Sequence, residues 1–262
     1  MSDIPLHRLY RHYSELPYSQ RVLYTATLLV IGLAYVFALI NLFHTYAGRA
    51  GGNPLIVSYK DILTAYTGSG KDSRLESALR GPMSSMLPPD ETGKLVTWVQ
   101  EGADRAKYES DIKPVLDRRC MSCHDGSNPH LPNLSSFDNL KKVTALDTGT
   151  DVFTLVRVSH IHLFGLTFVF FVMGLMYSHA YVRPVWFKCT VVAVPFAAVI
   201  VDISSWYLTK LYHPFAWLVL LSGGLMGVCF AFMWLTTMYQ LWFTPAPPAV
   251  LRREGRDIPN VG

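Results

Sequence analysis

The chain has few charged residues. Only 16% of its 262 residues are Asp, Glu, Lys or Arg, whereas 50% are hydrophobic, and soluble domains usually carry about a quarter charged residues. This shortage excludes an ordinary soluble globular protein and indicates a membrane protein with one polar insert. The net charge of +4 is small, and the basic residues flank apolar segments instead of forming one patch. We therefore expect no nucleic-acid partner.

Cysteine is also scarce. Four cysteines in a chain of this length do not indicate a disulfide framework. Cys189 and Cys229 lie alone in apolar segments, where we interpret them as packing residues. Cys120 and Cys123 instead belong to one short motif, CMSCH.

Long apolar runs are what the sequence has most of. A bilayer is spanned by about 20 mostly apolar residues, and four stretches qualify: Val22 to Phe43, near Val158 to near His179, one from about Trp186, and one from Pro214. The first is too long and lies too deep in the chain for a cleaved signal peptide, so we expect an uncleaved signal anchor.

Lysine and arginine residues in short loops orient the spans. They occur in the N-terminal segment, in the turn before the third span and in the C-terminal tail, and four spans put all three on one side, which should be the cytoplasm. The polar insert then lies outside. We expect a multi-pass protein of a bacterial inner membrane, with the insert in the periplasm and both termini cytoplasmic. The residues are Arg8, Arg11, Arg21, Arg183, Lys188, Arg252, Arg253 and Arg256.

The predicted fold class is all-α: a four-span transmembrane helix bundle with a helical domain inserted between spans 1 and 2. This predicts five segments along the chain. They are a cytoplasmic N-terminal segment (1–21), transmembrane helix 1 (22–44), the exported insert (45–157), transmembrane helices 2–4 (158–243) and a cytoplasmic tail (244–262).

The motif in the insert is Cys120-Met121-Ser122-Cys123-His124, the C-x-x-C-H pattern that attaches c-type haem. Two thiols at this spacing reach the two vinyl groups of one porphyrin, and the adjacent imidazole meets the iron. A redox dithiol would favour a thioredoxin-like βαβ setting, and a zinc site would need a second ligand pair; neither is found in the sequence. We predict one covalent haem c, with His124 as the proximal ligand.

The segments around this motif come in an unusual order. SRLESALRGPMSSMLPPDETGKLVTWVQEGA precedes YESDIKPVLDRRCMSCHDG. Over roughly residues 60–140 the insert resembles a monohaem cytochrome c domain in circularly permuted order, which is physically reasonable because domain termini often lie close together. The resemblance implies Met86 as the distal iron ligand, with Met83 as the alternative; His130 or a five-coordinate iron stays open.

A wider resemblance covers nearly the whole chain. The runs LVRVSHIHLFGLTFVFF, HAYVRPVWFK and SWYLTKLYHPFAW look similar to a group of proteobacterial membrane cytochrome c-like proteins, which implies that the haem domain and the bundle act as one unit. The leading hypothesis is electron transfer between a membrane redox complex or the quinone pool and a soluble periplasmic carrier. Whether the chain is itself an enzyme stays open, as does a homo-oligomer, and an electron-transfer protein or oxidoreductase subunit is favoured.

Histidines form the second candidate site. His44, His160, His162 and His213 are expected at the outer membrane edge. They would be structural interface residues, ligands of a haem b or part of a quinone-side site, or ligands of copper or zinc. The latter two support the alternative function, a subunit of a quinol-oxidising or metal-containing membrane enzyme with haem c as its electron wire. A haem-based sensor or assembly factor ranks last, because the short cytoplasmic segments leave no room for an output domain.

An acidic residue lies inside an apolar run. Asp202 falls in the outer third of the third span, where a carboxylate usually faces other helices and has a partner. The candidate partners are the outer-edge histidines, Arg157 and Lys210.

Overall fold

The chain is all-helical in a computed structural model that describes residues 11–81, 83–129, 131–245 and 247. Within these residues there is no β-strand, only an isolated antiparallel bridge between Ser73 and Leu146. The predicted fold class is confirmed at this level.

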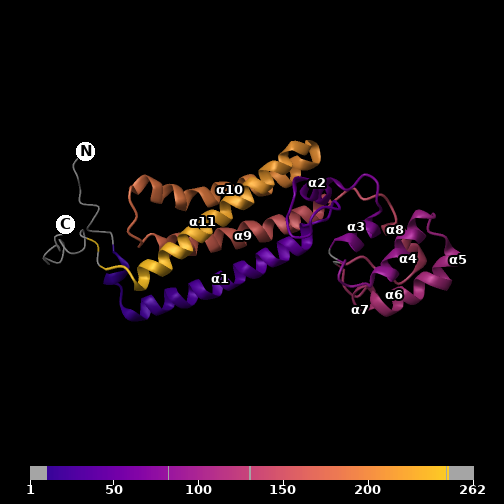
Figure 1. Cartoon of the computed structure of the whole chain (residues 1–262), viewed down its shortest axis with the longest axis horizontal. Coiled ribbons are helices and arrows are strands. Elements are labelled where there is room, and N and C mark those ends of the chain that lie inside the picture. Colours follow the sequence, from indigo (N-terminus) through magenta and orange to yellow (C-terminus); the bar gives the residue numbers. More distant parts are fainter. Residues whose placement is uncertain (1–10, 82, 130, 246, 248–262) are drawn as a thin grey trace. The chain divides into compact units, whose positions relative to one another are not determined.

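Four helices are long and apolar enough to cross a membrane, as predicted. They are α1 (Tyr18–Tyr46), α9 (Val152–Tyr177), α10 (Val185–Leu211) and α11 (Ala216–Trp242), the last preceded by the 3-10 helix η4 (His213–Phe215) (Figure 1). The first two begin earlier than the apolar runs alone indicate, at Tyr18 and Val152. The backbone hydrogen bonds of a helix do not end where its side chains become polar, so the helices extend beyond the apolar stretch at these ends.

The described residues form two compact units. The membrane unit comprises the residues up to Ala38, Arg157–Ser205, and those from Leu218 onward. The insert unit comprises Leu39–Val156 together with Trp206–Trp217. The second segment of the insert unit was not expected, because it connects two membrane-spanning helices.

Aromatic contacts join the helices of the membrane unit. The rings of Tyr35 on α1 and Phe230 on α11 are stacked with centroids 4.0 Å apart, and Phe170 on α9 meets Phe196 on α10 edge to face. Trp234 Nε1 on α11 donates a hydrogen bond to the Leu28 carbonyl at 2.8 Å. This approach requires Gly32, because a Cβ there would lie 2.8 Å from Trp234 Nε1.

The insert unit is built from short helices. These are α2 (Tyr59–Thr67), α3 (Arg74–Arg80), α4 (Pro89–Gln100), α5 (Arg105–Lys107), the π-helix η3 (Tyr108–Ile112), α6 (Lys113–Arg119), α7 (Met121–His124) and α8 (Phe137–Val143) (Figure 1). Most of them contribute to one buried apolar cluster, which we call the insert core. Its members are Leu75, Leu79, Leu87, Leu95, Trp98, Ala103, Tyr108, Ile112, Val115, Leu116, Leu134 and Leu140.

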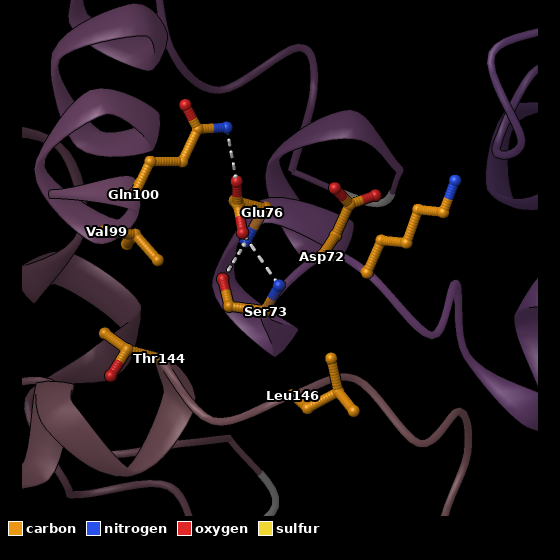
Figure 2. Close-up of a pocket in the computed structure, with 8 residues that line it drawn as sticks. Asp72, Ser73, Glu76, Val99, Gln100, Thr144 and Leu146 are labelled. Atoms are coloured by element: carbon orange, nitrogen blue, oxygen red, sulfur yellow. Dashed lines mark hydrogen bonds between the residues drawn. The ribbon is translucent and has the colours of Figure 1, made fainter. Parts of the chain in front are cut away.

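A capping box begins α3 and also links it to α4. The backbone N–H of Ser73 donates to Glu76 Oε2 at 2.7 Å, and the Glu76 N–H donates to Ser73 Oγ at 3.1 Å. The other carboxylate oxygen of Glu76 accepts from Gln100 Nε2 at 3.0 Å (Figure 2). Burial favours a higher pKa for Glu76, but these hydrogen bonds and the charge of Arg80 outweigh it, so the pKa is lowered. The ionised carboxylate therefore fixes the α3–α4 pair beside a hollow of about 270 Å³ (Figure 2).

The loop before α9 crosses the end of α2 at very short range. Thr150 donates to the Ala65 carbonyl from both its N–H and its hydroxyl, each at 3.0 Å. Gly68 and Gly149 both have a positive φ, and a Cβ on them would lie 1.9 Å from Asp147 O and 2.3 Å from Tyr66 O. Only glycine allows the two backbone segments to meet this closely.

Residues from the α10–α11 connection complete this part of the insert unit. Trp206 stacks on Tyr66, and Trp217 stacks on Tyr59 with centroids 5.0 Å apart. Lys210 Nζ donates to the carbonyl oxygens of Tyr66, Thr150 and Thr148 at 2.6, 2.8 and 3.2 Å. These contacts are why Trp206–Trp217 belongs to the insert unit.

Candidate functional site

The cysteine motif forms a single helical turn after α6. The N–H groups of Cys123 and His124 donate to the Cys120 carbonyl at 3.1 and 2.9 Å. Residues three and four positions apart on a helix share a face, so both thiols and the imidazole start from the same side of the backbone. Both cysteines are free thiols; Cys120 is half-buried and Cys123 is exposed.

The imidazole of His124 is held through one of its nitrogens. Nδ1 lies 2.8 Å from the Pro132 carbonyl oxygen, which can only accept, so Nδ1 carries the proton in this bond. A backbone hydrogen bond holds the same two segments together: the Leu134 N–H donates to the His124 carbonyl at 2.9 Å. A neutral imidazole protonated at Nδ1 leaves the Nε2 lone pair for a metal. Histidines that bind a metal through one ring nitrogen typically donate the N–H of the other to a group such as a backbone carbonyl.

The thiol of Cys120 does not have the character of a reactive nucleophile. Burial raises its pKa, and the negative charge of Glu91 adds to the effect. Redox-active C-x-x-C motifs depend on a lowered pKa for the attacking thiol. This environment favours a structural or covalently attached thiol at Cys120 over a dithiol catalyst.

Two arginines immediately before the motif hold it against α4. Arg118 Nη2 and Arg119 Nε donate to the two carboxylate oxygens of Glu91 at 2.7 and 2.9 Å. The hydrogen bond from Arg118, and then that from Arg119, outweigh burial and lower the pKa of Glu91. The carboxylate therefore stays ionised and fixes the start of the motif.

The two candidate distal methionines differ in burial. Met83 is partly buried and packs against the insert core, whereas Met86 is 59% exposed. Cys120 and Met121 pack against the same core as Met83. The methionine loop and the cysteine motif, which lie far apart in sequence, thus share one core. His130, the open histidine alternative, lies outside the described residues.

The donor set fits a covalently attached haem. The fit consists of two free thiols on one helical turn, an imidazole whose Nδ1 is already bound to a carbonyl, and apolar side chains beside them. The thiols would attach the porphyrin, and His124 Nε2 together with Met86 or Met83 would hold its iron.

The four candidate histidines are all exposed. His44 and His213 belong to the insert unit, and His160 and His162 belong to the membrane unit. His162 Nδ1 lies 2.9 Å from the Val158 carbonyl one turn earlier on α9. Within the described part of the chain, no three His, Cys, Asp or Glu side chains are grouped so that they could hold a metal ion.

Asp202 has a partner that sequence analysis missed. Its carboxylate is buried and accepts a hydrogen bond from Ser222 Oγ on α11 at 3.0 Å. Lys210, one of the expected partners, donates instead to main-chain carbonyls of the insert unit. A serine inside the apolar run of α11 was the available signal, since polar residues in such runs tend to hydrogen-bond across helices.

Comparison with known proteins identifies only the membrane part. A family model described as a transmembrane helical domain matches residues 151–248, which include α9, α10 and α11. No curated protein matches the chain, and no solved structure matches it. These results agree with a multi-pass membrane protein.

Proposed function

We propose that this multi-pass membrane protein is a c-type cytochrome that transfers electrons between a membrane partner and a soluble periplasmic protein. The observation that carries the proposal is the geometry of the motif: the thiols of Cys120 and Cys123 lie on one helical turn, and the Pro132 carbonyl leaves Nε2 of His124 available. A bound haem would supply a one-electron Fe(II)/Fe(III) couple.

The chain's own residues would hold and orient that group. Glu91 fixes the start of the motif through Arg118 and Arg119. His124 would take the proximal position, and Met86, with Met83 as the alternative, the distal one. A thioether ligand raises the reduction potential relative to two histidines, which suits an electron carrier.

The membrane unit would anchor the haem near its partner. Tethering raises the effective concentration of a redox pair that shares one membrane. We propose that this membrane is a bacterial inner membrane, with the insert unit in the periplasm and the termini in the cytoplasm. The membrane-side partner would be a redox complex or the quinone pool. A reporter fused after Gly262 should then be active only in the cytoplasm, and a reporter active in the periplasm would reverse the orientation.

A haem count tests the function directly. The full chain, produced together with a cytochrome c maturation system, should keep haem on a denaturing gel, and a pyridine haemochrome spectrum should show one haem c per chain. Cys123→Ser should lose one thioether bond and alter that spectrum. Cys189→Ser is the matched control, because Cys189 is also an exposed free thiol but lies on α10.

Cofactor analysis also distinguishes the proposed electron-transfer function from the alternative. A pyridine haemochrome spectrum distinguishes haem b from haem c, and elemental analysis detects copper or zinc. A non-covalent haem b or a stoichiometric metal that is lost in a His162→Ala variant or in a separate His213→Ala variant would favour a quinol-oxidising or metal-containing enzyme subunit. A colourless purified protein would refute both functions.

A further inference from the structure

A second hollow in the insert unit has a different chemistry from the motif. It measures about 280 Å³ and is lined by Arg49, Arg74, Asp147, Thr150, Asp151 and Thr154, among others. In liquid water one molecule occupies about 30 Å³, so the hollow has room for a small polar group. Its lining carries two positive and two negative side chains.

Two charged groups of the lining have polar atoms with no hydrogen-bond partner among the residues that the structure describes. Asp147 is only 5% exposed, and its Oδ2 is buried with no partner. Its other oxygen accepts from the Gly149 N–H at 2.9 Å. Arg49 Nε is likewise buried without a partner. The Lys210 ammonium attracts the Asp147 carboxylate electrostatically, but neither atom makes a hydrogen bond within the described part of the chain. A buried polar atom without a hydrogen bond is costly, so both atoms indicate a missing ligand with a donor and an acceptor.

The two other charged groups of the lining differ: Asp151 is hydrogen-bonded, and Arg74 is exposed. The Asp151 carboxylate is occupied at the start of α9, where it accepts from the Thr154 N–H and hydroxyl at 2.9 and 2.5 Å. Arg74 is exposed and takes part in none of the ion pairs found in the described part of the chain. The groups of the hollow that can still bind a ligand are therefore the guanidiniums of Arg49 and Arg74 and one carboxylate oxygen of Asp147.

The lining residues adjoin the ends of two membrane-spanning helices. Arg49 follows the last residue of α1 by three positions, and Asp151 directly precedes α9. A helix of 29 residues, such as α1, is about 43 Å long at 1.5 Å per residue. A bilayer is about 40–45 Å thick when its head groups are included, so a helix of this length that crosses the bilayer would place its ends at head-group depth.

We propose that this hollow binds the head group of an aminophospholipid such as phosphatidylethanolamine. The phosphate would lie between Arg49 and Arg74, because guanidinium groups bind phosphate oxygens through paired hydrogen bonds. The primary ammonium would donate to Asp147 Oδ2. Phosphatidylglycerol offers that oxygen only neutral hydroxyl donors, which bind a carboxylate less strongly than an ammonium does, and a choline head group has no N–H to donate.

Lipid binding to the delipidated full-length protein tests this. Native mass spectrometry should show phosphatidylethanolamine retained about tenfold more tightly than phosphatidylglycerol or phosphatidylcholine of the same chain length, as one additional charge-assisted hydrogen bond predicts. Equal binding of the three lipids would overturn the proposal. Displacement of the lipid by millimolar inorganic phosphate alone would assign the hollow to free phosphate and would also overturn it.

Two substitutions test binding of the ammonium and binding of the phosphate separately. Asp147→Asn keeps the oxygen that accepts from Gly149 and should remove the preference for phosphatidylethanolamine while leaving phosphatidylglycerol binding intact. Arg74→Gln, at an exposed position, should weaken both lipids about tenfold. Arg80→Gln is the control, because Arg80 pairs with Asp72 outside this hollow, and it should change neither. An unchanged lipid preference in a folded Asp147→Asn variant would contradict the assignment.

Discussion

The ammonium nitrogen of Lys210 lies 2.6 Å from the carbonyl oxygen of Tyr66, 144 positions earlier in the chain. Lys210 also donates to the carbonyls of Thr150 and Thr148. One side chain near the end of α10 therefore satisfies main-chain oxygens of both α2 and the loop before α9. This contact joins the α10–α11 connection to the insert unit, which the order of segments along the chain does not suggest.

Replacing Lys210 should loosen the loop that it holds. Lys210→Met removes charge-assisted hydrogen bonds to three carbonyls, and we expect the free energy of local opening to fall by roughly 2–3 kcal/mol. Hydrogen exchange of the Thr150 amide, which donates to Ala65, measures this opening. Lys60→Met is the control, since Lys60 is exposed on α2. Equal exchange in the two variants would show that the three contacts contribute little.

The close approach between the end of α2 and the loop before α9, at Gly68 and Gly149, should tolerate no side chain on either glycine. Gly68→Ala places a Cβ 1.9 Å from Asp147 O, so we expect a loss of stability above about 4 kcal/mol, the range of exceptional point mutations. Gly70→Ala is the matched control, because Gly70 also has a positive φ but no atom within 4 Å of its Cβ. It should cost only about 1–2 kcal/mol of backbone strain. Thermal unfolding of both variants separates steric clash from strain.

The distal ligand can be assigned with two variants of the haem-loaded protein. If Met86 is the ligand, Met86→Ala abolishes the weak long-wavelength sulfur-to-iron band of the oxidised spectrum and lowers the reduction potential. Met83→Ala should keep the band and reduce thermal stability, because Met83 packs against the insert core. Loss of the band in Met83→Ala alone would transfer the assignment to Met83.

Acid should weaken the attachment of the cysteine motif to α4. The pKa of Glu91 in the folded protein is lowered from 4.5, chiefly by the hydrogen bond from Arg118. A lowered folded-state pKa stabilises the protein fully above the unfolded value, and the contribution is lost as pH falls through the folded value. Glu91→Gln should therefore reduce stability at pH 7 and approach the wild type below pH 4.5.

Denaturant unfolding across that pH range provides the measurement for Glu91. Glu109→Gln serves as the control, because Glu109 pairs with Lys113 at the exposed surface of the same unit, where ion pairs contribute little. If the difference in the free energy of unfolding between the wild type and Glu91→Gln stays constant from pH 7 to pH 3, the charge of the carboxylate does not stabilise the motif.

Some features of this molecule follow from short stretches of sequence. Hydropathy predicts the four membrane-spanning helices, because the length of an apolar run is a local property and the bilayer sets its minimum. The spacing of Cys120, Cys123 and His124 likewise predicts their common side of one helical turn, because that geometry depends only on neighbouring residues.

Other features depend on residues that meet only after folding. Ser222 as the partner of Asp202, Glu91 as the partner of Arg118, and the difference in burial between Met83 and Met86 involve neighbours far apart in sequence. No local pattern specifies which of several donors reaches a given acceptor. Candidate partners for Asp202 could therefore be named from the sequence, but the serine was missed.

The sequence by itself determined the helical class, the four spans and the motif, since apolar length and residue spacing act along the chain. Only the tertiary structure decided that Trp206–Trp217 belongs to the insert unit and that Asp147 and Arg49 line one hollow. The physical reason is that stacking, carbonyl hydrogen bonds and buried charge act across space, between segments whose separation along the chain carries no information about their distance.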